Sequence, residues 1–345
     1  MWKIQHSFHF EHKNDSLFVQ SDWKKYKLRI SIENSKIIYG VLQKLRYKSF
    51  NSLSEFKKII RRYTSLSNSE KLLNLLIEKE ILVNIPVHAS NLKFGRQENF
   101  FRNFESNGIS AQQLNKELQS KTVLIVGLGG YGTNTAMLFA RMGIKRLVLI
   151  DADTIESTNI NRQILYDEVD VGRKKVIVCK EKIKRIDNSI DVECYDTFIK
   201  SEEQMIQLLD NVDIVMNSAG YYNINKDSEF VTHFILEACK SRGVPVLNYT
   251  GSFIGPITYI NYPDVYYTFV SNSLVKSTLI NQEIEREIND CNSAFIPRIT
   301  ISCSIAVWEA VRFLINLPRD IDLEKNVIII DTVSYVNHRI ITVVE

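Results

Sequence analysis

Residues 122–175 carry side chains whose types and spacing suit the binding of a nucleotide. An apolar run, Thr122 to Val126, leads into four closely spaced glycines, which are Gly127, Gly129, Gly130 and Gly132. Glycine lets the backbone turn tightly and approach phosphate oxygens, and the free N–H groups at the start of a following helix attract an anion. A second apolar run stops at Asp151, 24 residues after Gly127, near the spacing of about 20 residues expected for a carboxylate that binds ribose hydroxyls. This order predicts a nucleotide-binding βαβ unit, and it fits NAD, FAD, S-adenosylmethionine or ATP.

A cluster of basic and amide side chains follows Asp151 and narrows the choice of nucleotide. Its members are Asn159, Asn161, Arg162 and Gln163, with Lys174 and Lys175 at the start of the next predicted helix. A triphosphate carries several negative charges, and its transfer chemistry needs cations placed on them, whereas a dinucleotide needs few. A lysine at a helix N-terminus is unfavourable unless an anion offsets it. The cluster therefore favours ATP, with Arg162 and Lys175 flanking the phosphates. The alternative is that Arg162 caps a loop and the lysines are solvated.

The segments GLGGYG, LIDADTIESTNINRQ and VGRKKV resemble the ubiquitin-activating-enzyme-like superfamily, the ThiF/MoeB group of adenylating proteins. These enzymes use ATP to activate a C-terminal carboxylate and release pyrophosphate. The resemblance implies that Asp151 binds ribose. It also implies contacts to the phosphates and the reacting centre from Asn159, Arg162, Gln163 and Lys175. Family members commonly place an arginine from the arm before the first core strand against the ATP, often from the opposite subunit, and Arg102 is its expected counterpart. The expected catalytic residues are thus Arg102, Arg162 and Lys175.

Strands and helices alternate after residue 121, which predicts an α/β class with a Rossmann-like, doubly wound, mainly parallel sheet. Helices are expected at 172–186, 201–210 and 227–242, and strands at 190–194, 213–217 and 245–249. Residues 250–262 predict a strand, a turn at Gly255-Pro256 and a second strand. Residues 264–297 predict a long irregular loop of functional use, 299–316 a buried helix, and the C-terminal residues two antiparallel strands.

Residues 1–85 predict a separate small domain of winged-helix-like form. Strands are expected within 7–32 and at 81–85, and helices at 34–46, 54–63 and 67–79, with Asn34, Ser52 or Ser54, and Ser67 as caps. This stretch holds 16 Lys and Arg against 8 Asp and Glu, a net charge of +8 within a chain of net charge +3. Such a basic module suits an acidic polymer, a peptide or a nucleic acid. The third helix offers only Lys71 and Lys79 for groove reading, so peptide capture by strand addition is favoured over DNA binding or a purely structural role.

The order of domains is similar to that of MccB-like and PaaA-like enzymes, which mature ribosomally made peptides. It implies a recognition domain at 1–85, an arm at 86–120 and an ATP-binding adenylating domain at 121–345. It further implies a homodimer and a bound precursor peptide whose glutamate side chain or C-terminus is activated in peptide-antibiotic biosynthesis. The alternatives are nucleotidylation of a peptide C-terminus as in microcin C, an NAD-dependent oxidoreductase, and a pseudoenzyme that retains nucleotide and binds peptide. The histidines are poorly placed for hydride transfer, which disfavours the oxidoreductase.

Three departures from the MccB-like pattern bear on cofactors. The two C-x-x-C zinc pairs are absent, so zinc is not expected. Magnesium is expected with ATP, but Gly220 stands where the family has an Asp, which leaves Asp227 or water to hold the ion. The five cysteines are scattered, and Cys291, in the irregular loop, has no assigned role. No signal peptide and no apolar run of about 20 residues are evident, so we expect a cytoplasmic protein with neither a membrane nor a nucleic-acid partner.

Overall fold

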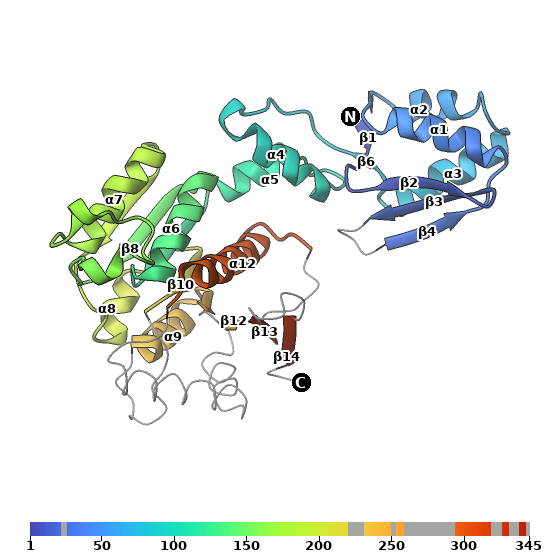
Figure 1. Ribbon diagram of the computed structural model, residues 1–345. Helices are drawn as coiled ribbons and strands as arrows, with labels where there is room; N and C mark the ends of the chain where they lie inside the picture. Colours follow the sequence, from blue (N-terminus) through green and yellow to red (C-terminus); the bar gives the residue numbers. More distant parts are fainter. Residues whose placement is uncertain are drawn as a thin grey trace. The chain divides into compact units, whose positions relative to one another are not determined.

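The computed structural model describes residues 1–21, 26–219, 231–249, 253–258, 294–318, 326–330 and 338–342. These residues fall into two compact units, Met1–Glu117 and Leu118–Glu345 (Figure 1). Each unit has a hydrophobic core of its own. No helix in the described part of the chain is long and apolar enough to cross a membrane.

The unit that begins at Leu118 is built on a sheet with the strand order β14-β13-β12-β11-β10-β7-β8-β9. Strands β11, β10, β7, β8 and β9 run parallel, whereas β12, β13 and β14 are antiparallel. The prediction of an α/β fold with a mainly parallel sheet is therefore confirmed. The strand bounds are β7 Thr122–Val126, β8 Arg146–Ile150, β9 Asp191–Tyr195, β10 Ile214–Asn217, β11 Val246–Tyr249, β12 Phe253–Thr258, β13 Asn326–Ile330 and β14 His338–Thr342.

Helices cover both faces of this sheet, because successive strand side chains point to opposite sides. On one face, Leu124, Val126, Val148 and Ile150 share a core with α8 (Glu202–Gln207) and α9 (Val231–Arg242). The other helices are α6 (Gly130–Met142), α7 (Lys175–Ile186) and α12 (Ile296–Leu314), and α6 packs against both α7 and α12. Figure 1 shows α6 beside α12.

The turn expected at Gly255-Pro256 is wrong, because β12 continues through both residues. Leu247 pairs with Ile257 and Tyr249 pairs with Ile254, so β12 advances one residue more than β11 between these two pairs. The extra residue is a β-bulge, where a strand tolerates a residue that lacks an N–H. A proline and a glycine can therefore stand in a strand here without forming a turn.

Helix α12 begins at Ile296 rather than at the expected residue 299, so the last two residues of the expected irregular loop are helical. Pro297 lies in the first turn of the helix. At that position the missing N–H of proline would have had no partner within the helix, so proline starts this helix instead of ending the preceding loop. Residues 264–293 of the expected loop lie outside the described part of the chain.

The N-terminal unit has the element order expected of a winged-helix-like fold, with two short strands in addition. A sheet of order β2-β3-β4 and a sheet of order β5-β1-β6 accompany the helices. The expectation missed β1 and β5, because strands this short show too little alternation to detect. The bounds are β1 Trp2–Ile4, β2 His9–Lys13, β3 Ser16–Ser21, β4 Tyr26–Ile30, α1 Ser35–Leu45, β5 Ser49–Phe50, α2 Leu53–Ile60, α3 Leu66–Glu78 and β6 Leu82–Asn84.

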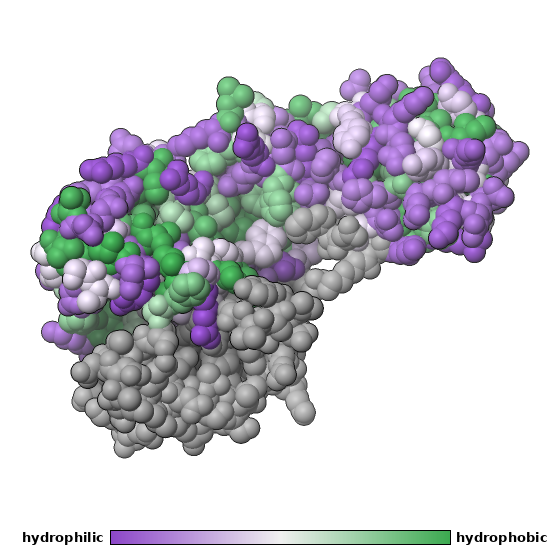
Figure 2. All heavy atoms as spheres, in the orientation of Figure 1, coloured by the Kyte–Doolittle hydropathy of each residue, from purple (hydrophilic) through white to green (hydrophobic). Residues whose placement is uncertain are grey.

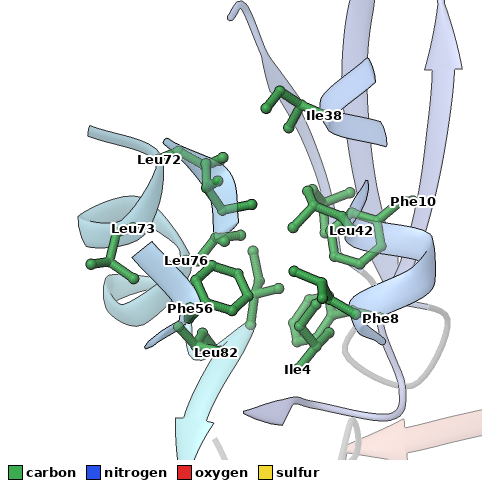
Figure 3. Packing of buried hydrophobic residues seen from close by; sticks show 14 of the residues in the cluster. Ile4, Phe8, Phe10, Ile38, Leu42, Phe56, Leu72, Leu73, Leu76 and Leu82 are labelled. Atoms are coloured by element: carbon green, nitrogen blue, oxygen red, sulfur yellow. The ribbon is translucent and has the colours of Figure 1, made fainter. Parts of the chain in front are cut away.

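Apolar side chains from both sheets and all three of these helices form one core. Figure 3 shows Phe8, Phe10 and Leu42 facing Phe56 and residues of α3. The caps only partly follow the expectation. Ser52 accepts from the Glu55 N–H at 3.3 Å as expected, but α3 is capped by Ser65 and not by Ser67. Asn34 makes no side-chain cap.

A helical arm ends this unit. It consists of η1 (Leu92–Phe94), α4 (Gly95–Phe101) and η2 (Arg102–Phe104), and α5 (Ala111–Leu118) follows. Phe101 is buried, and the ring of Phe100 lies 5.9 Å from that of Phe101 and 5.7 Å from that of Phe104. Ser110 caps α5 as expected, because its hydroxyl accepts from the Gln113 N–H at 3.3 Å.

Candidate nucleotide site

The glycine turn lies where the strand order of the sheet reverses. Strand β7 has β8 on one side and β10 on the other, and the chain proceeds from β7 to β8 before it returns to β10. In open α/β sheets, ligands bind at such switch points, beyond the carboxyl ends of the strands. Ser218, just after β10, donates from its hydroxyl to the carbonyl of Gly127 at 2.7 Å and thereby fixes the turn from the β10 side.

The glycines of this turn serve different purposes. A Cβ on Gly132 would lie 1.8 Å from the Gly127 carbonyl oxygen, and a Cβ on Gly127 would lie 2.8 Å from the Ser218 carbonyl oxygen. These two glycines are required by the protein's own packing, and Gly127 also has a φ of +85°. A Cβ on Gly129 would meet only the Gln163 amide, at 3.9 Å. The space beside the Gly129 backbone is therefore open, and we call it the open side of Gly129.

Asp151 lies directly beyond β8 and is tied to the glycine turn. Its Oδ2 accepts from the Leu128 N–H at 2.6 Å, and its Oδ1 accepts from the Asp153 N–H at 2.8 Å. The carboxylate is buried, so its orientation is fixed by these backbone donors. Each carboxylate oxygen has further lone pairs, which ribose hydroxyls can use.

Arg162 and Asn159 lie on a short turn segment after Asp151, which includes η3 (Ser157–Asn159). Asn159 is buried and accepts from the Glu156 N–H at 3.2 Å, so its carbonyl group holds the loop together. Arg162 Nη1 donates to the Thr158 carbonyl at 2.6 Å and to Asn161 Oδ1 at 3.1 Å. No carboxylate pairs with Arg162 in the described ranges, so its remaining N–H donors are available to an anion.

Gln163 contributes a buried polar atom that lacks a partner. The side chain is buried, and its Oε1 makes no hydrogen bond with the described residues. Buried polar atoms without a partner are costly and uncommon, so a donor from a bound molecule or a water is expected there. The side chain of Arg162 lies 3.6 Å from a Cβ position on Gly130, and the Gln163 amide lies near Gly129, so both line the glycine turn. A nucleotide can supply the missing donor from a ribose hydroxyl, because its phosphate oxygens only accept hydrogen bonds.

Lys175 begins α7, as expected, but it already has an anionic partner. Its buried ammonium donates to Asp153 Oδ2 at 2.7 Å, and Lys174 pairs with Asp196 at 2.9 Å. The argument that a lysine at a helix N-terminus requires a bound anion is therefore wrong here, because the chain itself supplies the carboxylates. The Asp153 side chain is half exposed, whereas the Lys175 side chain is buried.

Tyr166 connects the glycine turn to α7, and the analysis of the sequence missed it. Its buried hydroxyl donates to the Leu128 carbonyl at 3.1 Å and lies 3.4 Å from the Lys175 carbonyl. Burial raises the pKa of this phenol far above its ordinary value, so the hydroxyl keeps its proton. The only signal in the sequence was an aromatic residue three positions after Gln163, which is typical of many core positions.

The remaining expected site residues lie in the N-terminal unit or outside the described residues, so their place in the site stays a prediction. Arg102 lies exposed on η2 of the N-terminal unit. Gly220, Asp227 and Cys291 lie outside the described residues. The described part of the chain contains no group of three or more His, Cys, Asp or Glu side chains that could hold a metal ion.

A profile of the ThiF family matches residues 95–341 of the chain. The chain belongs to the ThiF family. A relative from Dictyostelium discoideum, adenylyltransferase and sulfurtransferase MOCS3, is 32% identical over 158 residues, which are 45% of this chain and 34% of that protein. A probable molybdopterin-synthase adenylyltransferase from Gracilaria tenuistipitata var. liui is 26% identical over 197 residues, which are 57% of this chain and 51% of that relative. The ThiF-family chain thus spans between about a third and a half of the length of these curated relatives.

Solved structures share the fold of this ThiF-family chain over almost its whole length. E. coli MccB, solved with succinimide, matches with a TM-score of 0.73 and 18% identity, covering 99% of this chain and 96% of MccB. PaaA matches with a TM-score of 0.70 and 20% identity, covering 98% of each chain. MccB has also been solved with ATP and with N-formylated MccA. The resemblance to the ThiF/MoeB group, with MccB-like neighbours, is confirmed.

Proposed function

We propose that this protein uses ATP to activate a carboxylate of a ribosomally made precursor peptide. The proposal depends on one observation, which is that polar groups without partners and free space lie together beside the glycine turn. The polar groups are the free donors of Arg162 and the unpartnered Gln163 Oε1, and the free space is the open side of Gly129, all within a ThiF-family fold. Relatives are named adenylyltransferases, and MccB, which has the same fold, has been solved with ATP and with a peptide.

The first step of the proposed chemistry needs no general base, because an ionised carboxylate is already a nucleophile; the later attack by an amide or a carbon releases a proton to solvent or to a base of the peptide. Its oxygen attacks the α-phosphorus of ATP, the bond from that phosphorus to the β-phosphate oxygen breaks, and pyrophosphate leaves with the electron pair. The product is an acyl-adenylate, which an amide or an enolisable carbon of the same peptide can attack with loss of AMP. Attack on the γ-phosphorus instead would give an acyl-phosphate and ADP.

Each site residue has a role in this proposal. The glycine turn offers backbone N–H groups to phosphate oxygens, and Asp151 accepts from ribose hydroxyls. Arg162 and Lys175 stabilise the charge that develops on the phosphates. Arg102 would add a further cation from the arm, from the same chain or from the other subunit of a homodimer. Magnesium would accompany ATP and neutralise phosphate charge.

The N-terminal unit would recognise the peptide. We assign recognition to residues 1–85, the arm to 86–120 and the adenylating domain to 121–345. In the described part of the chain, β4 pairs with β3 alone, so its other edge has unpaired backbone groups that an extended peptide could use. In this proposal the protein acts in the cytoplasm, in peptide-antibiotic biosynthesis.

The test is to incubate the protein with Mg-ATP and candidate precursor peptides while AMP, ADP, pyrophosphate and peptide mass are measured. Peptide-dependent release of AMP and pyrophosphate is expected. Arg162→Ala should lower kcat/KM on the order of 100-fold or more, whereas Arg141→Ala, which removes an exposed arginine of α6, should not. ATP cleavage that never depends on peptide, or none at all, would overturn the proposal and favour a binding scaffold. Thermal stabilisation by NAD but not by ATP would favour the oxidoreductase.

A further inference from the structure

The end of α1 packs against the loop after β1 and brings basic and aromatic side chains together in the N-terminal unit. Arg46, at the C-terminal end of α1, donates from Nη2 to the His6 carbonyl at 3.0 Å. The Arg46 guanidinium lies 5.6 Å from the centre of the Tyr47 ring, and the His6 and Tyr47 rings are 6.4 Å apart in an edge-to-face arrangement. Tyr47 is 74% exposed, so an aromatic face stands at the surface beside the arginine.

A third segment, the arm, reaches the same place. Gln5 Nε2 donates to the Asn103 carbonyl at 2.6 Å, which holds η2 against the loop after β1. Arg102, the residue before Asn103, is exposed and lies within electrostatic reach of His6. Three segments that are distant in the sequence therefore place His6, Arg46, Tyr47 and Arg102 on one surface, which we call the basic patch.

The basic patch has more positive charge than the described residues neutralise. Lys3 forms an ion pair with Glu105, which is buried and also accepts from the Ala111 N–H at 3.2 Å. The Glu105 carboxylate therefore neutralises Lys3 and not Arg46 or Arg102. Neither Arg46 nor Arg102 has a carboxylate partner in the ranges that the structure describes, and the Nε of Arg46 is buried without a hydrogen bond. Figure 2 shows the N-terminal unit as a largely hydrophilic surface.

The lowered pKa of His6 reflects its burial and the same excess of positive charge. Its pKa is lowered by burial and then by the positive charges of Arg46, Arg102 and Lys3, while Glu105 acts in the opposite direction. These are the charged groups that face the ring from α1, β1 and the arm. An anion bound to the patch would offset the cations and raise the pKa of His6. Binding of an anion and protonation of His6 should therefore strengthen each other.

We propose that the basic patch is a docking surface for an acidic segment of a peptide. The inference rests on the proposed peptide-activating function. It adds that the protein selects its substrate peptide through an acidic segment. Arginine guanidinium groups bind carboxylates through two parallel hydrogen bonds. The exposed Tyr47 ring beside Arg46 offers an apolar face against which a peptide can pack. A nucleic acid would need cations along its phosphate backbone, whereas these cations are gathered at one point.

The first test measures binding to the full chain by fluorescence anisotropy, without ATP. The probes are a labelled peptide of alternating Gly and Glu and its Gly and Gln counterpart. We expect the Glu peptide to bind more tightly than the Gln peptide. Arg46→Gln should weaken that binding about fivefold, which is the upper range for an exposed ion pair. The matched control is Lys36→Gln, which removes an exposed charge at the other end of α1 and should change binding by less than about twofold.

Two further variants distinguish a loss of binding from a loss of folding. Arg46→Lys keeps the positive charge but cannot form two parallel hydrogen bonds to a carboxylate. Its affinity for the Glu peptide should lie between those of the wild type and of Arg46→Gln. Arg102→Gln removes an exposed side chain that makes no side-chain hydrogen bond with the described residues, so it should weaken binding without unfolding the unit. Equal effects of Arg46→Gln and Lys36→Gln, equal binding of the two peptides, or tighter binding of a single-stranded oligonucleotide would overturn the proposal.

The second test uses pH. Binding of the Glu peptide should tighten as the pH falls from about 7.5 to about 5.5, above the range where the peptide's own carboxylates protonate. His6→Gln should remove that dependence, and an unchanged pH dependence in this variant would contradict the proposal. Peptide-dependent release of AMP measured in parallel separates the two ideas. Activity without a preference for acidic peptides would overturn the docking surface alone, and acidic binding without ATP turnover would overturn the proposed function alone.

Discussion

Lys175 Nζ donates a hydrogen bond to Asp153 Oδ2 at 2.7 Å, and this pair joins the start of α7 to the loop after β8. The lysine side chain is 7% exposed and the aspartate is 51% exposed. The Lys175 ammonium is therefore held in place by a carboxylate of the same domain.

Replacing Asp153 should destabilise the unit that begins at Leu118. Asp153→Asn leaves the buried Lys175 ammonium without its counter-ion, and we expect a loss of about 1 kcal/mol, reduced by the exposure of the aspartate. Asp196→Asn is the control, because Asp196 pairs with the half-exposed Lys174 and should cost less than about 0.5 kcal/mol. Urea unfolding measures both, and equal losses would show that the burial of Lys175 does not matter.

Two glycine substitutions should separate folding from nucleotide binding. Gly129→Ala adds a methyl group that meets only Gln163, at 3.9 Å, so the melting temperature should stay near that of the wild type while ATP binding weakens at least tenfold. Gly132→Ala places its methyl group 1.8 Å from a carbonyl oxygen, so it should destabilise the domain by several kcal/mol. Thermal denaturation and calorimetric titration with ATP test both. Normal ATP affinity in Gly129→Ala would refute the position assigned to the phosphates.

Tyr166→Phe should lower stability and ATP turnover together. The change removes a hydroxyl that donates to the Leu128 carbonyl, and we expect a loss of about 1–2 kcal/mol because that buried acceptor loses its donor. The glycine turn would also lose its link to α7, so KM for ATP should rise. Tyr195→Phe is the control, because its hydroxyl donates to the partly exposed Glu193 and should leave KM unchanged. A rise of KM in both variants would count against a positioning role for Tyr166.

The stability of the N-terminal unit should depend on pH through His6. Burial and the cations around it lower the pKa of His6 in the folded protein, so between the folded and the unfolded pKa the unfolded chain binds more protons. Stability should therefore be lost as the pH falls through the unfolded value of about 6.5 toward the folded pKa. His6→Gln should flatten this part of the profile, as followed by urea unfolding at a series of pH values. An unaltered profile would show that other groups cause the dependence.

The described cysteines should be unreactive in the folded protein. Burial raises the pKa of Cys194 to about 11 and that of Cys303 to about 12, and Cys179 and Cys239 are fully buried with pKa values also raised by burial. Because the thiolate is the nucleophile, iodoacetamide at neutral pH should label these four only after unfolding. Peptide mapping by mass spectrometry tests this, and rapid labelling of Cys194 in the native protein would contradict the expected environment.

The nucleotide site stays a prediction, and the sequence could propose its residues because they lie close together in the chain. The glycines, Asp151, Asn159, Arg162, Gln163 and Lys175 all fall within about 50 residues of one βαβ unit, and local periodicity places them at the ends of neighbouring strands. Ser218 was not predictable, because it follows a strand more than 90 residues away that pairs with β7 only in the folded sheet. The turn expected at Gly255-Pro256 failed for a similar reason, since a bulge depends on the register with the neighbouring strand.

The sequence by itself determined the class of fold, the glycine turn and the ThiF-like series of polar residues, because these depend on local spacing and on the alternation of strands and helices. Only the tertiary structure showed that Asp153 neutralises Lys175, that Gln163 Oε1 lacks a partner and that Gly129 has free space while Gly132 has none. It also gathered His6, Arg46 and Arg102 from three separate segments into one basic patch. Pairing, burial and free space are relations between distant residues, and only the packing of the folded chain fixes them.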